Sequence, residues 1–230
     1  TKLIAAFSLV AIIGFGLGIY GYVTVDNLRE NVDEVGAVRL PSVNALQDMI
    51  TAQTRINVGE RGLMMPQITE PERRQAQYDY IDEAWALAEA ARAKYEPLPR
   101  TPQEDKLWQE AVSRWDEWKT AHNKVRALQE QKDKLLAEGV EASDPQIAAL
   151  DEQAYDAFLE ARSHYLAVAG PMEANVELNN SIASTEVQTA ENRAAQAVSW
   201  IGLIAIGGLI VAVALGAFIA RTIGKPVGRL

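Results

Sequence analysis

The chain has 230 residues, contains no cysteine and carries a formal net charge of −9 at pH 7. Without cysteine there is no disulfide, no zinc site built on thiolates, no thiol catalysis and no covalently attached haem. All 31 acidic residues but only 18 of the 22 basic residues lie between two uncharged apolar runs, which gives that region a net charge of about −13. A surface this acidic repels phosphates, and we expect no binding to nucleic acid.

The first apolar run extends from Leu3 to Val25 without a charged residue. Its about 23 residues exceed the roughly 20 that cross a bilayer as a helix, whereas a signal peptide has a shorter apolar core. The run ends near Tyr20 and Tyr22, which suit the aromatic belt at a membrane interface. We therefore predict a transmembrane helix over residues 3–25. Because Thr1 is not a start methionine, we also expect residues before it.

The region after this run is rich in Ala, Glu, Gln, Leu and Arg and has few turn signals, so it reads as helix throughout. Two segments, Thr69–Glu72 and Thr101–Glu104, have the pattern of a capping box at a helix start. Proline and glycine mark the breaks between helices. We predict four helices: from the membrane to about Met65, from about Glu70 to Glu96, from about Pro102 to Glu138, and from about Pro145 through the second apolar run.

Apolar residues recur at spacings of three and four in each of these helices, as helical faces require. Examples are Ala52, Ile56, Gly59 and Leu63 in the first, and Tyr78, Ile81, Trp85 and Ala88 in the second. Short connections make consecutive helices antiparallel neighbours. The predicted fold is therefore all-α: an antiparallel up-down four-helix bundle whose first and last helices continue into the membrane. Pro41 and the Gly170–Pro171 pair fall inside the long helices, where they should kink or loosen them.

The second apolar run, Ala194–Ala220, is also uncharged and has Trp200 near its outer end. Three basic residues follow the run, and Lys2 precedes the first run, whereas the acidic middle has no such cluster. The positive-inside rule then places both termini in the cytoplasm and the middle outside. We predict an extracytoplasmic sensor domain over residues 26–196, a second transmembrane helix over 197–220 and the start of a cytoplasmic linker over 221–230.

A bundle of this plan between two membrane helices resembles the sensor region of bacterial methyl-accepting chemotaxis proteins (chemoreceptors). The segment Leu40–Leu46, followed by Arg55 and Arg61–Met64, is similar to the first helix of their four-helix-bundle sensor domain. The segment Arg221–Leu230 is similar to the opening of a HAMP linker. The resemblance implies a homodimer in the bacterial inner membrane, with its sensor domain in the periplasm. It also implies a cytoplasmic kinase or adaptor that is reached through a region after residue 230.

The resemblance also suggests where a ligand binds, because dicarboxylate- and amino-acid-sensing chemoreceptors hold ligand carboxylates with arginines of the first helix. Arginine suits this role because its planar guanidinium makes paired hydrogen bonds with a carboxylate. Arg55 and Arg61 lie roughly 240° apart around the helix, so they share a pocket only if it lies between two helices or two subunits. Ion pairing with neighbouring acids is the alternative role for each arginine. The candidate ligand-binding residues are Thr51, Arg55, Arg61, Tyr155, Arg162 and Tyr165.

Catalysis is not expected, because the sequence lacks a G-x-S-x-G, an HExxH and a phosphate-binding loop. His122 and His164 have no metal-ligating partner at helical spacing, so we expect them to be structural and predict no metal and no cofactor. Trp108 and Trp115 are seven residues apart, the core repeat of a bundle. Core packing is thus favoured for these tryptophans over an aromatic cage for a quaternary ammonium group.

Together these features predict a transmembrane chemoreceptor that senses a small solute, such as an organic acid or an amino acid. The solute would bind directly or through a periplasmic binding protein, and helix displacement would carry the signal to the HAMP and signalling region. One alternative is the input module of a sensor histidine kinase or a diguanylate cyclase. Another is a structural or protein-interaction module that binds no ligand.

Overall fold

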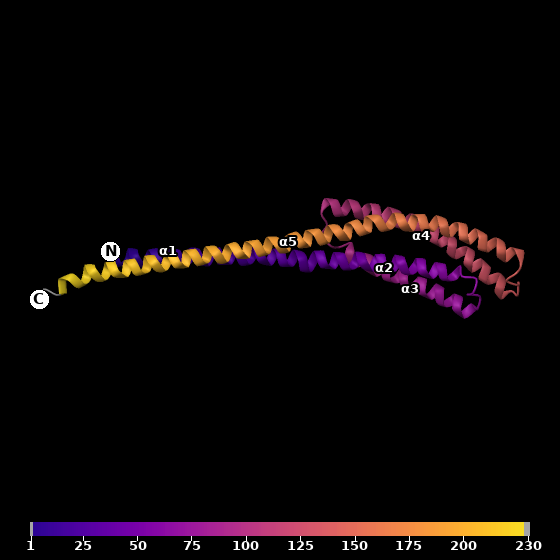
Figure 1. Cartoon of the computed structure of the whole chain (residues 1–230), viewed down its shortest axis with the longest axis horizontal. Coiled ribbons are helices and arrows are strands. Elements are labelled where there is room, and N and C mark those ends of the chain that lie inside the picture. The colour runs from indigo at the N-terminus through magenta and orange to yellow at the C-terminus, as the bar shows by residue number, and fades with distance from the viewer. Residues whose placement is uncertain (1, 228–230) are drawn as a thin grey trace. The chain divides into compact units, whose positions relative to one another are not determined.

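The computed structural model describes the backbone of residues 2–227 and the side chains of residue 4 and residues 7–221. Within them the chain is helical apart from its loops (Figure 1). The helices are α1 (Lys2–Asp33), a π-helix η1 (Glu34–Arg39), α2 (Leu40–Leu63), α3 (Pro71–Tyr95), α4 (Pro102–Ala137) and α5 (Pro145–Val227). The prediction of an all-α, antiparallel four-helix bundle is confirmed, and the predicted helix ends agree to within two residues.

Two compact units make up the chain. One is the bundle, Gly36–Ala183, which contains α2, α3, α4 and the first part of α5. The other combines Thr1–Val35 with Ser184–Leu230 and so contains α1 and the last part of α5. The domain limits expected from the sequence, 26–196 among them, stay predictions.

The connection between α1 and α2 is the π-helix η1, which ends two residues before Pro41. A proline inside a helix cannot donate a backbone hydrogen bond, and its ring clashes with the carbonyl four residues earlier, here that of Ala37. A π turn is wider and uses i→i+5 hydrogen bonds, which relieves this clash. The predicted loosening near Pro41 therefore takes the form of a π-helix, whereas α5 stays α-helical through Gly170–Pro171.

The start of α3 differs from the prediction of a capping box at Thr69–Glu72. The N-cap is Glu70, which has extended backbone (φ −67°, ψ 131°) and makes no side-chain capping hydrogen bond. The prediction was wrong because a residue before a proline is kept out of the helical region, so Glu70 cannot be helical in front of Pro71.

The start of α4 has the capping box that the sequence predicts. Thr101 precedes Pro102 and is extended (φ −69°, ψ 160°), so it is the N-cap itself. Its side chain accepts a hydrogen bond from the Glu104 backbone N–H, and the Glu104 carboxylate accepts one from the Thr101 backbone N–H. At the other end of α4, Gly139 has φ +89°, a left-handed conformation that favours glycine after a helix.

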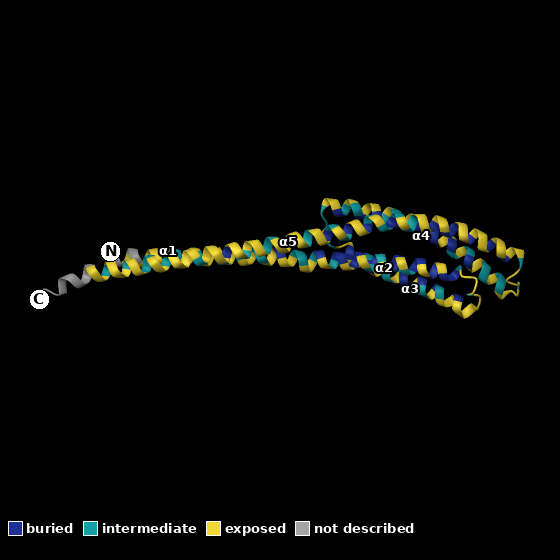
Figure 2. Cartoon of the chain, viewed as in Figure 1, coloured by how far each residue is buried: buried dark blue, intermediate teal, exposed yellow. Residues whose placement is uncertain are grey.

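The main core of the bundle joins residues of all four of its helices. Leu46 and Ile56 of α2, Ile81 of α3, Trp118 of α4 and Met172 of α5 are all fully buried within it. Figure 2 shows that buried residues gather along the bundle helices. A smaller cluster of α4 and α5 lies beside it and consists of Ala121, Val125, Ala157, Phe158 and Ala161.

In the second unit, exposed residues predominate instead (Figure 2). Large apolar residues are among them, such as Phe15 of α1 and Leu209 of α5. Two helical segments are long and apolar enough to cross a membrane, one within Phe7–Leu63 and one within Pro145–Arg221. Polar contacts join the two helices near one end of the unit: Asn31 donates to the Glu186 carboxylate and accepts from Arg193 Nη1 at 2.9 Å. By length and apolar composition, these two segments are candidate membrane spans.

Two glycines of α2 lie against α3 and give a matched test of this packing. A Cβ on Gly59 would lie 2.5 Å from Cγ1 of the fully buried Ile81, whereas a Cβ on Gly62 would meet only the end of the flexible Gln77 side chain. We expect Gly59→Ala to lower the free energy of unfolding by about 1–3 kcal/mol through overpacking. Gly62→Ala should leave it unchanged or raise it by up to about 1 kcal/mol, because alanine favours the helix.

Urea denaturation of the chain in detergent micelles, followed by circular dichroism, measures both changes. Ile81→Ala removes both Cγ1 and Cδ1, so Gly59→Ala should cost less in an Ile81→Ala background than in the parent chain. Equal effects of the two alanine substitutions would contradict the packing described for α2 and α3.

Candidate functional site

Helices α2 and α5 are in contact at the level of the predicted ligand-binding residues. Gln53 Nε2 donates a 2.7 Å hydrogen bond to the Tyr165 carbonyl oxygen. Thr51 and Arg55 flank Gln53 at two residues on either side, and Arg162 lies three residues before Tyr165. The structure thus brings four of the six predicted residues, two from each helix, to one level of the bundle.

The other two predicted residues lie closer to the loops that join α2 to α3 and α4 to α5. Arg61 is eight residues beyond Gln53, and Tyr155 is ten residues before Tyr165, or about 12 to 15 Å at 1.5 Å per residue. Because α2 and α5 are antiparallel, Arg61 and Tyr155 share a second level. Both side chains are exposed.

Arg55 contacts α3 rather than α5. Its Nη2 lies 3.8 Å from Glu83 Oε2, and its Cζ lies 4.7 Å from the centre of the Tyr80 ring. The ion pair is largely open to solvent, so it contributes at most about 1 kcal/mol. Ion pairing with an acid, the alternative role expected for Arg55, is therefore present, but it is weak enough for a carboxylate ligand to compete with it.

The exposed residues of α2 form a single stripe, which we call the α2 stripe. Successive members alternate between spacings of four and three, the heptad pattern by which helices pair with other helices. Two of the predicted ligand-binding residues, Thr51 and Arg61, belong to it. The members of the α2 stripe are Leu40, Asn44, Gln47, Thr51, Thr54, Val58 and Arg61.

On α5, the exposed large apolar residues of the bundle region also share one face. Tyr155, Leu159 and Leu166 follow one another at spacings of four and seven, and exposed Arg162 lies between the last two. Tyr165 differs from them, because its ring packs 6.2 Å from that of Trp118 against the main core.

Trp108, Trp115 and Trp118 lie in the main core of the bundle, and Trp85 packs against it. Trp85, Trp115 and Trp118 contact one another with ring centres 5.0 to 5.7 Å apart, which is the range of favourable aromatic pairs. Their faces are thereby used against each other rather than around a ligand. Core packing, the interpretation favoured from the sequence, describes them.

Next to the tryptophans lies a buried pair, Glu60 and His122, each 1% exposed. Glu60 Oε1 is 2.7 Å from His122 Nδ1, and Trp85 Nε1 donates to His122 Nε2 at 3.2 Å. Because an indole N–H can only donate, Nε2 accepts, and the ring proton on Nδ1 is donated to Glu60. The second oxygen, Glu60 Oε2, is buried without a hydrogen-bond partner among the described residues. His122 therefore bonds to a buried carboxylate and to a tryptophan of the bundle, and its structural role stays a prediction.

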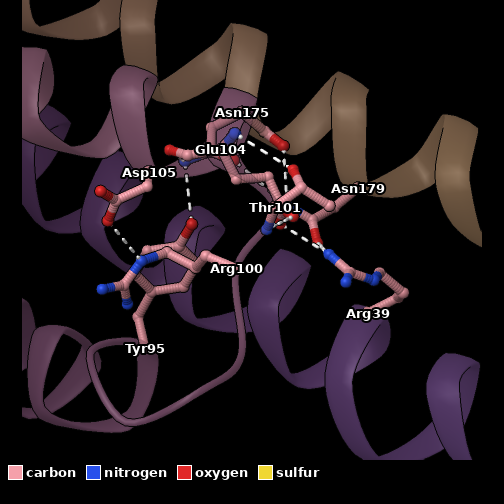
Figure 3. A network of polar contacts seen from close by, with 8 residues as sticks. All are labelled: Arg39, Tyr95, Arg100, Thr101, Glu104, Asp105, Asn175 and Asn179. Carbon is pink, nitrogen blue, oxygen red and sulfur yellow. Dashed lines mark hydrogen bonds and ion pairs between the residues drawn. The ribbon is translucent and has the colours of Figure 1, made fainter.

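A second buried cluster lies where α3 ends and α4 begins (Figure 3). Arg39 Nη1 donates to Glu104 Oε1 at 2.7 Å and to Asn179 Oδ1 at 3.1 Å. Asn175 Nδ2 donates to the Tyr95 hydroxyl at 2.9 Å, and Asn179 Nδ2 donates to the Asn175 carbonyl oxygen at 3.0 Å. All five side chains are at most 4% exposed. We call these five residues the proximal cluster.

The electrostatics of the proximal cluster favour an ionised Glu104. Burial alone raises the pKa of its carboxyl group, but hydrogen bonds from Thr101 and Arg39 outweigh burial and hold that pKa below its usual value of 4.5. Burial raises the pKa of Tyr95 to about 12, so its hydroxyl stays protonated at neutral pH.

A cavity of about 570 Å³ lies between the first part of α3 and the last part of α4. Its charged lining residues already bond to one another or to nearby groups. Arg74 contacts Asp133 and donates to Gln129 at 2.7 Å, and Tyr78 donates to Asp133 at 2.6 Å. Burial and Asp133 raise the pKa of Tyr78. Within the described residues, no three histidine, aspartate or glutamate side chains gather so that they could hold a metal ion.

Sequence reasoning missed the proximal cluster, although two signals pointed to it. The capping box singled out Glu104, and Asn175 and Asn179 lie four residues apart on one helical face. Arg39 gave no signal, because its partner Glu104 is 65 positions away in the chain.

The fold and its apolar end segments define a helical-bundle module flanked by candidate membrane-spanning helices. The family model described as "Four helix bundle sensory module for signal transduction" matches residues 1–194, and the chain belongs to this family. The resemblance to the chemoreceptor sensor domain is thereby confirmed. No curated protein and no solved structure matches the chain. The side chains of the HAMP-like segment after Arg221 lie outside the described residues.

Glu104 gives the fold a dependence on pH that a variant can isolate. A carboxyl group whose pKa is lowered by folding stabilises the fold above its unfolded pKa, near 4.5, and this contribution is lost as the pH falls through the lower folded pKa. We expect Glu104→Gln to lower Tm at pH 7, and the difference from the parent chain to shrink below about pH 4.5. Thermal melts between pH 7 and pH 3 measure this. Glu110→Gln, at a surface ion pair, is the control and should change Tm little at any pH.

Substitution of the two residues of the Glu60–His122 pair should change the free energy of unfolding differently. Glu60→Gln keeps an acceptor for His122 and removes a buried charge, so the free energy of unfolding should be unchanged or higher. His122→Ala leaves the Glu60 carboxylate buried without a partner and should cost about 3–5 kcal/mol. Urea denaturation compares the two variants. A loss in Glu60→Gln as large as that in His122→Ala would show that the carboxylate is itself stabilising.

Proposed function

We propose that this chain is the sensory and membrane-spanning part of a bacterial chemoreceptor, with its bundle in the periplasm and its membrane helices in the inner membrane. The observation that supports this most is the continuity of α5, a single helix from Pro145 in the bundle to Val227 beyond the second apolar run. A helix transmits a displacement along its axis because every turn is hydrogen-bonded to the next. The family match to a sensory module for signal transduction supports the same role.

The proposed ligand is a small organic acid or amino acid that binds beside α2 and α5, between the level of the Gln53–Tyr165 contact and the level of Arg61 and Tyr155. Arg55 and Arg61 supply guanidinium groups for a carboxylate, Thr51 supplies a hydroxyl, and α5 supplies Tyr155, Arg162 and Tyr165. Arg55 faces α3 and Arg61 belongs to the exposed α2 stripe, so the two do not converge within one bundle. A pocket shared by two subunits accommodates this arrangement.

The proposed assembly is a homodimer that pairs through the α2 stripe. Its heptad spacing suits a helix–helix contact, and it includes exposed Leu40 and Val58. Basic residues after the second apolar run, Arg221 first among them, support a cytoplasmic C-terminal side. There the receptor would act on a kinase or adaptor through a HAMP and signalling region.

The relay requires the ligand to bind one of two bundle states more tightly than the other. A coupling free energy of about 1–3 kcal/mol is sufficient, and an axial shift of α5 by about 1–2 Å is the expected output.

Thermal-shift screening of the chain in detergent against organic acids and amino acids tests the sensing role. A ligand should raise Tm, and the rise should continue with the logarithm of its concentration above Kd. Arg55→Ala and Arg61→Ala should each weaken its binding by about 10-fold or more, because each removes a charge-assisted hydrogen bond worth roughly 1.5–3 kcal/mol. Arg114→Ala, which alters a surface arginine of α4 paired with Glu110, is the control and should bind as the parent does.

Two outcomes would count against parts of the proposal. If no solute raises Tm, alone or with periplasmic binding proteins added, the module that binds no small molecule becomes the better interpretation. If a solute binds equally well to Arg55→Ala and Arg61→Ala, the ligand lies elsewhere in the bundle.

A further inference from the structure

We infer that the proximal cluster is a latch that fixes the axial position of α5 in the bundle and must open for α5 to shift. The inference rests on the proposed relay function, because a latch on α5 has a signalling role only if α5 moves. The latch adds a location to that function: α5 is kept in its unshifted, resting position at the proximal cluster. The latch consists of Arg39, Tyr95, Glu104, Asn175 and Asn179.

The latch joins four elements at one end of the bundle. Arg39 is the last residue of η1, Tyr95 the last of α3, and Glu104 lies in the first turn of α4. Asn175 and Asn179 lie one turn apart on α5. The cluster lies close to the end of the bundle unit, because Asn179 precedes its last residue, Ala183, by four positions.

The bonds of α5 in the latch are directional. Asn179 Oδ1 accepts from Arg39 at 3.1 Å, and Asn175 Nδ2 donates to the Tyr95 hydroxyl at 2.9 Å. Hydrogen bonds weaken steeply beyond about 3.2 Å, so an axial shift of 1–2 Å breaks both.

Other contacts of α5 in the bundle tolerate a shift better. Val168 and Met172 make apolar contacts, which are non-directional and change gradually as surfaces slide. Lys124 reaches Glu160 of α5 at 2.9 Å, but both side chains are exposed and flexible enough to follow it. One further directional bond, from Gln53 Nε2 to the Tyr165 carbonyl oxygen at 2.7 Å, also resists a shift. The latch resists it more, because two α5 side chains in it are hydrogen-bonded to groups of η1, α3 and α4.

Burial makes the latch a two-state element rather than a gradual one. Glu104 is fully buried, and both of its carboxylate oxygens accept hydrogen bonds, from Arg39 and from the Thr101 backbone. A buried polar group that loses its partner must find another or pay its desolvation. Intermediate positions of α5 leave several such groups unpaired at once. The state with all latch hydrogen bonds formed and the state with these groups bonded elsewhere are therefore favoured over intermediate ones.

The backbone that carries Arg39 provides a way for the latch to open. η1 is π-helical, a rare conformation that occurs often at functional sites. A change of η1 from π to α winding would rotate Arg39 about the helix axis and separate it from Glu104. The wide turn avoids the Pro41 ring clash and the ion pair holds Arg39, so opening of the latch has to overcome both.

Spin-label distances in the ligand-free chain in lipid nanodiscs test the latch. The chain has no cysteine, so Ala76→Cys on α3 and Asn180→Cys on α5, both at exposed positions, place the labels cleanly. They lie roughly 35 Å apart along the bundle at 1.5 Å per residue, so an axial shift changes their distance directly. We expect one narrow distance in the parent, and in Asn179→Ala a mean shift of about 1–2 Å or a second population.

Two further variants make the test decisive. Tyr95→Phe removes only the hydroxyl that accepts from Asn175, keeps the packing, and should shift the distance in the same direction by less. Gln129→Ala is the matched control: it removes a buried amide that accepts from Arg74 in the other half of the bundle, so it should lower Tm but leave the distance unchanged.

Unchanged distances in Asn179→Ala and Tyr95→Phe, with or without a lower Tm, would overturn the latch and leave the proximal cluster a purely stabilising network. A shift of equal size in Gln129→Ala would also overturn it, because the position of α5 would then follow general stability. No ligand is present in these measurements. The latch can therefore fail while the solute screen still shows sensing, and the solute screen can fail while the latch stands.

Discussion

The ion pair between Arg39 and Glu104 is the interaction around which the proximal end of the bundle is organised. Both groups are removed from water, so each requires the other as well as the hydrogen bonds around it. Glu104 divides its two oxygens between the start of its own helix and Arg39. The end of the α3–α4 connection and the π-helix are thereby held together through one carboxylate, and Arg39 extends the network to Asn179 of α5. Local helix capping and long-range packing depend on the same side chain.

The helical architecture follows from local rules, which is why the sequence predicts it well. Prolines at Pro71, Pro102 and Pro145 mark three helix starts, and Gly139 marks an end. The one error at a helix start was the capping box predicted at Thr69. That pattern requires Glu70 to be helical, but the following Pro71 keeps Glu70 extended. The sequence indicated a disturbance at Pro41, but a π-helix rather than a kink depends on how the surrounding bundle holds the chain.

The candidate sites follow from contacts between distant residues, and the sequence predicts them less completely. Thr51, Arg55, Arg162 and Tyr165 do reach one level, because antiparallel topology alone determines it. Topology does not determine which neighbouring helix an arginine side chain contacts. Arg55 contacts Tyr80 and Glu83 of α3, and the spacing of residues along a helix identifies neither as its partner. The proximal cluster and the Glu60–His122 pair join positions more than 60 apart in the chain, beyond the reach of any periodicity.

The narrowness of the α2 stripe has a consequence for how such modules diversify. Thirteen of the 24 residues of α2 are buried, and its exposed residues lie in one row. Substitutions along that row leave the interior packing intact, since surface changes away from buried features usually alter stability by less than about 0.5 kcal/mol. New binding properties can therefore evolve by substitution within the α2 stripe, while the buried core that determines the fold stays the same.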